Sequence, residues 1–145
     1  PRSRPCSELA TWAPPTPGDI VWCRFPNLPG RSPGPKPRPA LVCDVTEHED
    51  GVAVTVAYGT SQGLQRLHRG EFAITRQSNP AAYGSAGLSF DTKFDLRQLV
   101  ALPWNEEFFA VPAWAPHGQH PKLGSLHASM MRAAVAAYQG AHRKN

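Results

Sequence analysis

Proline is unevenly distributed along this chain of 145 residues, and its placement decides which segments can form regular structure. Eleven of the 16 prolines fall within the first 39 residues. Proline fixes φ and lacks a backbone N–H, so it is poorly tolerated inside helices and central strands. We therefore expect a flexible, extended leader over residues 1–16 and a long surface loop over residues 26–37.

The remaining length suits a single domain. At 145 residues the chain can bury one hydrophobic core but not two. We expect this domain over residues 17–140, followed by a short tail over residues 141–145. No apolar run approaches the ~20 residues that span a bilayer. The three cysteines lack metal-type spacing, which favours a reduced, cytoplasmic setting without membrane contact.

Short apolar segments between the loops predict strands. They are β-branched, alternating or continuously apolar, and they cover residues 20–25, 40–45, 52–58 and 71–75, with one or two more strands in 88–102. Glu49-Asp50-Gly51 is a turn signal between the second and third strands. Asn79 and Pro80 predict the start of one helical turn that ends near Gly84 or Gly87.

Near the C-terminus the apolar period changes from two to that of a helix. Apolar residues recur on one helical face, at Leu126, Met130, Met131, Ala134, Val135 and Tyr138. We expect a helix over residues 123–139, capped by Ser125, ended by Gly140 and packed through Leu126, Met130, Ala134 and Tyr138. The sum is a mainly β (α+β) fold: a small curved barrel, its antiparallel sheet closing on itself, with a C-terminal helix.

Charge differs between the ends and the centre of the chain. Residues 1–38 hold six Lys/Arg against two acids, and residues 108–145 hold four against none, whereas residues 39–107 hold five against nine. Basic ends of this kind favour nucleic acid or an acidic protein as the partner. A solvated surface gives the same pattern, so charge alone leaves both interpretations open.

Arg38 stands between the proline-rich loop and the second predicted strand. Its guanidinium is permanently charged and carries five donors in a fork that matches phosphate oxygens. Arg38 is therefore a candidate phosphate-binding residue. An ordinary exposed arginine that leads into a strand has the same local sequence.

The pair of segments "GDIVW" (18–22) and "RPALV" (38–42) resembles the opening of the MazF/PemK family of toxin endoribonucleases, the toxins of type II toxin–antitoxin systems. The turn "AYGTSQ" (57–62), the segment "KFDLRQ" (93–98) and the helix lead-in "PKLGSLHASMM" (121–131) extend the similarity over roughly residues 17–140. The resemblance implies an SH3-like barrel followed by a C-terminal helix. It also implies a homodimer that binds single-stranded RNA and an acidic segment of a cognate antitoxin.

The chemistry implied by the resemblance is RNA cleavage without a metal or other cofactor, by attack of the 2′-hydroxyl on the adjacent phosphorus. The family's catalytic arginine and threonine fall on Arg38 and Thr60. Lys93 and Asp95 serve either as acid and base or as an ion pair at the barrel rim. We further expect Lys36, Ser61, Gln62, His68 and Arg69 to bind RNA.

Other interpretations remain open. Trp22 and Trp104 either stack on bases or belong to the core. His117, His120 and His127 have a spacing that zinc sites use, but the segment lacks a Cys or acidic ligand, so we expect no metal. A similar barrel occurs in gyrase-poisoning toxins, and a binding or regulatory module without catalysis would keep the same fold.

Overall fold

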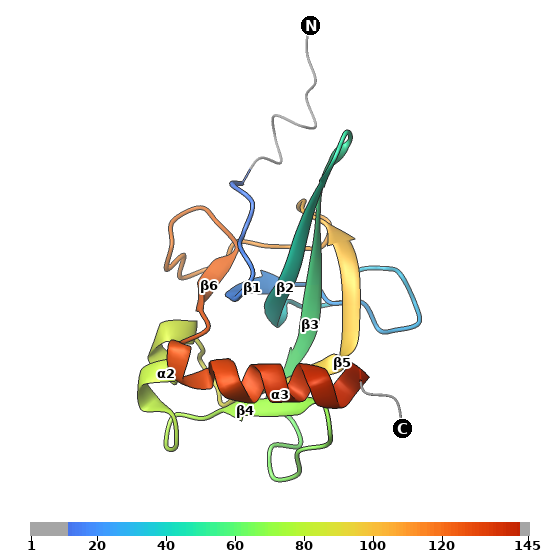
Figure 1. The fold of residues 1–145 in the computed structure, drawn as a ribbon. Coiled ribbons are helices and arrows are strands. Elements are labelled where there is room, and N and C mark those ends of the chain that lie inside the picture. The colour runs from blue at the N-terminus through green and yellow to red at the C-terminus, as the bar shows by residue number, and fades with distance from the viewer. Residues whose placement is uncertain (1–11, 143–145) are drawn as a thin grey trace, which may run out of the picture.

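The computed structural model describes residues 12–142, and its main feature is a six-stranded antiparallel sheet (Figure 1). The strands are β1 (Asp19–Cys23), β2 (Arg38–His48), β3 (Gly51–Thr60), β4 (Glu71–Ile74), β5 (Thr92–Pro103) and β6 (Lys122–Ser125). The strand order is β4-β5-β3-β2-β1-β6. The helices are α2 (Pro80–Ala86) and α3 (Met131–His142), with a 3-10 turn η1 (Ala128–Met130) before α3. The mainly β fold class predicted from the sequence is confirmed.

The central strands are apolar on both faces because each face of the sheet is covered. Ile20 and Leu41 belong to a core shared with α2, η1 and α3, whereas Val21 and Val42 belong to a second core shared with the segment 104–121. Alternate residues of a strand point to opposite faces. Adjacent apolar residues in β1 and β2 therefore supply two cores instead of exposing one face to water.

The sheet is curved (Figure 1), and its strand pairing is irregular in β2 and β3. The register shifts between Val42 and Asp44 in β2, and between Ala57 and Tyr58 in β3. At the second shift, residues 96–98 of β5 have no partner on β3, because Ala57 pairs with Leu99 and Tyr58 with Asp95. Such bulges increase the local twist. Among the described strands, β4 and β6 remain edges, so the sheet bends without closing by hydrogen bonds.

The C-terminal helix differs from the prediction. Residues 122–125 form β6, in which Ser125 pairs with Asp19 of β1, so Ser125 is not the helix cap. The His127 side chain instead accepts a hydrogen bond from the Ser129 N–H at the start of η1. α3 continues through Gly140 to His142, so the first two residues of the predicted tail are helical. The rest of that tail, 143–145, lies outside the described residues.

The packed face of α3 also differs in part from the predicted face. Met130 and Ala134 are buried as expected, and Leu126 packs against the same core, but Tyr138 is half exposed while Ala137 is buried in its place. α3 lies across β4 and β5 (Figure 1), and Ala137 belongs to the core that it shares with them.

Most of the predicted leader, residues 1–11, lies outside the described residues. Within the described part of that segment, Trp12 packs edge-on against Trp104, with 5.6 Å between the ring centroids. The Trp104 Nε1–H also donates to the backbone oxygen of Trp12, at 3.1 Å. Trp104 is therefore a core residue, which removes it from the candidates for base stacking.

Close contact between β2 and β3 requires glycine at position 59. A Cβ on Gly59 would collide with the carbonyl oxygen of Pro39 and would lie 2.9 Å from Cε1 of Phe94. Both neighbours are buried or held in the sheet, so neither can move without disturbing the pairing. Gly59 also precedes Thr60, the last residue of β3.

We predict that Gly59→Ala destabilises the fold by roughly 1–3 kcal/mol, because overpacking forces the β2 and β3 backbones apart. Urea denaturation followed by circular dichroism measures the change. Gly84→Ala is the matched control, since a Cβ there meets nothing within 4 Å and Gly84 lies inside α2. Alanine favours helices, so the control is expected to be neutral or stabilising. Equal stability of Gly59→Ala and the wild type would contradict the packing argument.

Candidate active site

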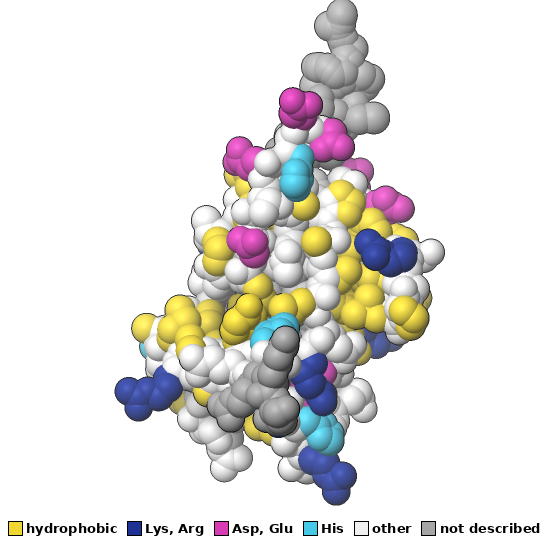
Figure 2. Space-filling model, turned by 45° about the vertical axis from the view of Figure 1, so that its right-hand side comes forward, with side chains coloured by type: hydrophobic (Ala, Val, Ile, Leu, Met, Phe, Trp, Pro, Cys, Tyr) yellow, Lys and Arg dark blue, Asp and Glu magenta, His cyan; other side chains and the backbone are white. Residues whose placement is uncertain are grey.

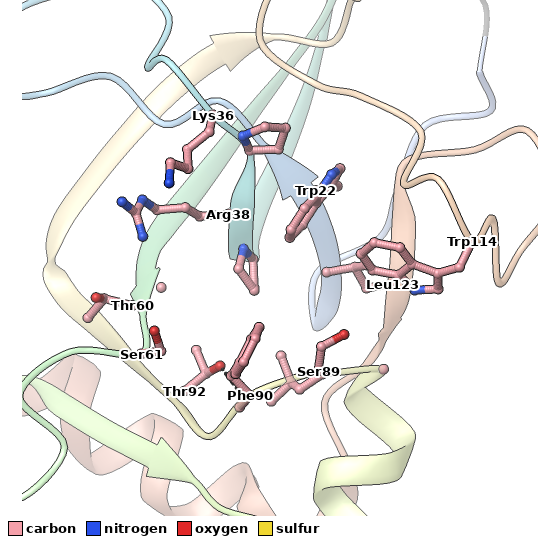
Figure 3. A pocket seen from close by; sticks show the side chains of 15 residues that line it. Trp22, Lys36, Arg38, Thr60, Ser61, Ser89, Phe90, Thr92, Trp114 and Leu123 are labelled. Carbon is pink, nitrogen blue, oxygen red and sulfur yellow. Dashed lines mark hydrogen bonds between the residues drawn. The ribbon is translucent and has the colours of Figure 1, made fainter.

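A pocket of about 430 Å³ opens where β2 begins and β3 ends (Figure 3). Lys36, Arg38, Thr60 and Ser61 line one end of it. Ser89, Phe90 and Thr92 line the middle, and Trp22, Leu123 and Trp114 line the other end. The pocket thus joins a cationic, hydroxyl-rich end to an aromatic end.

The register of β2 against β3 brings Arg38 and Thr60 together. Ala40 of β2 pairs with Tyr58 of β3. Because the strands are antiparallel, two residues earlier in β2 lie opposite two residues later in β3, so Arg38 comes opposite Thr60. Residues opposite each other on neighbouring strands have side chains on the same face. Four of the residues predicted from the sequence, Lys36, Arg38, Thr60 and Ser61, consequently line one pocket.

The backbone around Arg38 is constrained, whereas its guanidinium is free to bind a ligand. Pro37 and Pro39 flank it and fix the adjacent φ angles. The side chain is half-buried, and within residues 12–142 it makes no ion pair or hydrogen bond. An uncommitted guanidinium at the mouth of a pocket can bind a phosphate through two parallel hydrogen bonds.

The Thr60 hydroxyl is oriented by the turn that follows it. Its Oγ1 accepts a hydrogen bond from the Gln62 backbone N–H at 3.1 Å. A hydroxyl has one hydrogen to donate, and the Gln62 N–H uses only a lone pair of the oxygen. Thr60 can therefore donate its hydrogen to a phosphate oxygen held by Arg38. Gln62 contributes its backbone here, and its exposed side chain does not line the pocket.

Lys93 is buried beside this turn but does not line the pocket. Its Nζ donates to the carbonyl oxygens of Gly63 at 3.0 Å and Arg66 at 3.3 Å, and it pairs with Glu71 Oε1 at 3.1 Å. These contacts tie the loop after Thr60 to β4 and β5. They favour the structural alternative for Lys93 over a role as acid or base.

Asp95 is likewise buried outside the pocket and is committed to the β5 bulge. Its carboxylate accepts hydrogen bonds from the Arg97 backbone N–H, the Arg97 guanidinium and the Gln98 amide, at 2.9–3.0 Å. Burial by itself raises the pKa of Asp95, but the bonds from Arg97 and Gln98 together outweigh it and lower the pKa. A carboxylate with a lowered pKa is a weak base, which favours the ion-pair alternative for Asp95 as well.

His68 and Arg69 lie on a different surface from Arg38. Both border a groove between the loop 61–70 and α3, and neither lines the pocket. The His68 backbone N–H donates to Glu71 Oε1 at 2.7 Å, and Arg69 Nε donates to the Gly140 oxygen at 2.9 Å. The structure therefore does not bring these two predicted RNA-binding residues to the cationic end of the pocket, where Arg38 lies.

Of the three histidines considered as zinc ligands, His120 and His127 have structural partners. His120 Nε2 lies 2.8 Å from the Ala13 oxygen, and its Nδ1 accepts from the Lys122 N–H at 3.1 Å. His127 caps η1. Across residues 12–142, no three His, Cys, Asp or Glu side chains are grouped so that they could hold a metal ion. The same range contains no helix long and apolar enough to cross a bilayer.

Sequence reasoning did not identify Phe90 and Trp114 as pocket residues. Phe90 falls in the segment 88–102, where one or two strands are predicted, and no predicted element contains Trp114. The available signal was local: both residues stand in turns beside small or polar neighbours, where a core aromatic is unexpected. For Trp22 the sequence leaves both core packing and base stacking open, and the residue is half-buried at the edge of the pocket.

Charge is segregated along the β2–β3 hairpin. Its outer end carries the exposed acidic residues Asp44, Glu47, Glu49 and Asp50, and acidic side chains gather toward that end in Figure 2. Arg38 is the first residue of β2, at the opposite end of a strand that spans roughly 30 Å. The pocket thus lies at the hairpin end that is remote from these acids.

We predict that Asp95→Asn lowers the free energy of unfolding at pH 7 by roughly 1–3 kcal/mol, because it weakens hydrogen bonds to a buried charge. A lowered pKa means that Asp95 stabilises the fold above its ordinary pKa of 3.8 and loses this effect as the pH falls through the lowered value. The difference from wild type should therefore shrink below about pH 3.8. Denaturation between pH 7 and pH 3 measures it, with Glu106→Gln at an exposed position as the control. A pH-independent difference would contradict this assignment.

Comparisons with known proteins agree with the sequence resemblance. No match was found among curated protein sequences. Among solved structures, the chain is similar to an "Endoribonuclease in complex with its cognate antitoxin from Mycobacterial species", with a TM-score of 0.53 and 14% identity over 88% of this chain and 94% of that chain. At this identity the likeness concerns the fold. The family model described as "PemK-like, MazF-like toxin of type II toxin-antitoxin system" matches residues 16–136. Because that match covers most of the sequence, the chain belongs to the PemK-like, MazF-like family of type II toxins.

Proposed function

We propose that this toxin is a metal-independent endoribonuclease that cuts single-stranded RNA and thereby inhibits translation and growth. The observation that carries the proposal is the convergence of Arg38 and Thr60 in one pocket, with Lys36 and Ser61 beside them. The endoribonuclease activity named for the structural neighbour supports the same class of reaction. Because the substrate is mRNA, we place the activity in the cytoplasm.

In the proposed reaction the 2′-hydroxyl of one nucleotide attacks the adjacent phosphorus in line. A bond forms from O2′ to phosphorus and the bond from phosphorus to O5′ breaks, which leaves a 2′,3′-cyclic phosphate and a 5′-hydroxyl. The 2′-hydroxyl loses a proton and the leaving 5′ oxygen gains one. No oxidant or cofactor is needed for this balance.

The contribution of the protein is mainly to hold the phosphate and stabilise the added charge on its non-bridging oxygens. Arg38 supplies a bidentate cation, Thr60 a hydroxyl donor and Lys36 a second positive charge. None of the residues that line the pocket is a carboxylate or an imidazole. We therefore propose that the protons exchange with water, while Lys93 and Asp95 hold the strand and loop that position Thr60.

The two other functions considered from the sequence do not require this arrangement. A gyrase-poisoning toxin acts on a protein and needs no phosphate site made of an arginine and a threonine. A binding module without catalysis would retain RNA affinity but leave the RNA uncut. The uncommitted Arg38 guanidinium beside the Thr60 hydroxyl favours the nuclease over the gyrase-poisoning toxin, and the cleavage assay separates the nuclease from the binding module.

We further propose a cognate antitoxin as the protein partner and a homodimer as the active assembly. The structural neighbour is described in complex with its cognate antitoxin, which supports a partner of this kind. An acidic antitoxin segment would compete with RNA for Lys36 and Arg38, because a carboxylate and a phosphate use the same guanidinium donors. Competition between an acidic peptide and RNA tests a shared site, and light scattering tests the dimer.

We predict that Arg38→Ala lowers the cleavage rate of a long single-stranded RNA in EDTA by roughly 10²–10³-fold, because it removes a preorganised charge donor. Arg38→Lys should not restore the rate, since an ammonium cannot reproduce the bidentate fork. Thr60→Val should cost less, because it removes one neutral hydrogen bond and keeps the shape. Mapping of the product ends by mass spectrometry should find 2′,3′-cyclic phosphates.

Arg132→Ala is the matched control, since Arg132 is exposed on α3 and does not line the pocket. Circular dichroism confirms that each variant is folded. If folded Arg38→Ala cuts RNA at the wild-type rate, the assigned site is wrong. If the wild type binds RNA without cutting it, the binding-module alternative replaces the nuclease.

A further inference from the structure

The pocket continues well beyond the phosphate end, and this second part is aromatic. Past Thr60 and Ser61, the lining passes along the loop between α2 and β5, where Phe90 points into the pocket (Figure 3). It ends at Trp22 and Trp114, which come from β1 and from the segment 104–121. The established family membership and the proposed phosphate chemistry assign nothing to these aromatic rings.

Two of the rings are exposed to a degree that is unusual for their size. Phe90 is 71% exposed and Trp114 is 51% exposed. A single exposed apolar residue is ordinary in a soluble protein. Here two of them face one concavity that Trp22, Leu88 and Leu123 also line. A concave surface with several convergent apolar groups and a few polar ones is typical of a ligand site.

The loop that carries Phe90 is fixed although its ring is exposed. On one side, Gly87 adopts φ +70°, and a Cβ there would collide with the Leu123 backbone, so the end of α2 presses against β6. On the other side, Thr92 Oγ1 donates to the Phe90 oxygen at 2.8 Å, and the Asp91 carboxylate accepts from the Arg76 N–H at 2.8 Å. The backbone that carries the Phe90 ring is therefore held in place before any ligand arrives.

The segment that carries Trp114 is anchored in the same way. The backbone N–H of Trp22 donates to the backbone oxygen of Pro121 at 2.9 Å, and the backbone N–H of Ala110 donates to the backbone oxygen of Trp22 at 3.1 Å. The Trp114 ring stands edge-on to the Trp22 ring, with 5.4 Å between centroids and 71° between planes. Two aromatic groups held by the scaffold need little ordering on binding, which favours affinity.

We propose that Phe90 and Trp114 form a nucleobase subsite, which holds the unpaired base of a nucleotide next to the phosphate bound by Arg38. The proposal rests on the proposed function, because the phosphate end fixes where the base must lie. Unpaired bases bind proteins by stacking on aromatic side chains, whereas bases inside a duplex are not available for this. The hydroxyl of Ser89, which is exposed beside Phe90, faces the same space and can contact the edge of the base.

The test measures binding without cleavage. The probes are a short single-stranded oligonucleotide with 2′-deoxyribose throughout, which lacks the attacking hydroxyl, and a set in which one nucleotide at a time is abasic. Wild-type protein is expected to bind one abasic probe roughly 5- to 150-fold more weakly than the intact probe, as expected for the loss of one stacked base. Phe90→Ala and Trp114→Ala should bind that abasic probe and the intact probe with nearly equal affinity.

Tyr138→Ala is the matched control. Tyr138 is 50% exposed, much like Trp114, but it lies on α3 away from the pocket. This variant should keep the full preference for the intact probe.

Phe90→Tyr should also keep the preference for the intact probe, because a flat ring remains. Phe90→Leu should lose most of this preference, although it keeps the apolar bulk. Because Phe90 is highly exposed, its replacement removes little packing, and circular dichroism checks that every variant is folded.

The outcomes separate the subsite from the nuclease. If wild type binds intact and abasic probes equally at every position, or if Phe90→Ala and Trp114→Ala keep the wild-type preference, the subsite is wrong even where the wild type cuts RNA. If wild type fails to cut RNA in EDTA but shows a preference that depends on Phe90 and Trp114, the subsite is supported and the nuclease proposal fails. Cleavage maps add a third readout, in which Phe90→Ala should cut at more sequences than wild type.

Discussion

The position of the pocket depends on the antiparallel pairing of β2 with β3. That register sets Arg38, where a proline-rich loop ends, opposite Thr60, where β3 ends. The two strands can approach closely there because position 59 has no side chain. Burial on both faces holds the register, since a slip by one residue would exchange the residues of the two cores. The placement of Arg38 beside Thr60 in the pocket thus follows from the packing of the whole sheet.

A second consequence of the fold is the use of charged groups as internal supports. Lys93 and Asp95 are buried on β5, and each is surrounded by hydrogen-bonding partners: carbonyl oxygens and Glu71 for the lysine, Arg97 and Gln98 for the aspartate. Burying a charge is costly unless its partners replace the lost water. Apart from Glu71 of β4, the partners belong to a loop and a bulge, the segments with the least regular backbone pairing. The charges therefore order parts of the chain that the sheet itself does not order.

The local sequence pattern allowed part of this arrangement to be predicted. The hairpin turn and the apolar segments fix β2 and β3, so Arg38 and Thr60 could be expected at one rim. The local pattern does not predict β6, because only its pairing with the distant strand β1, such as Ser125 with Asp19, defines these four residues as a strand. The helical period predicts an apolar face but not how that face is rotated against β4, so the predicted core includes Tyr138 where the structure buries Ala137. Asp95 binds Arg97 and Gln98 because both lie in the three-residue bulge of β5. The spacing of residues in the sequence does not show where such a bulge occurs.

The long β2–β3 hairpin has a kinetic consequence. Its acidic outer end and the cationic start of β2 make the charge distribution of the molecule strongly uneven, although the formal net charge is only +4. A polyanion that approaches the hairpin tip is repelled, while one that approaches the other end is attracted. Under the proposed function, RNA that diffuses toward this protein would therefore approach it preferentially from one side. Such steering is confined to about a Debye length, ~8 Å at physiological ionic strength, so dissolved salt weakens it and slows encounter.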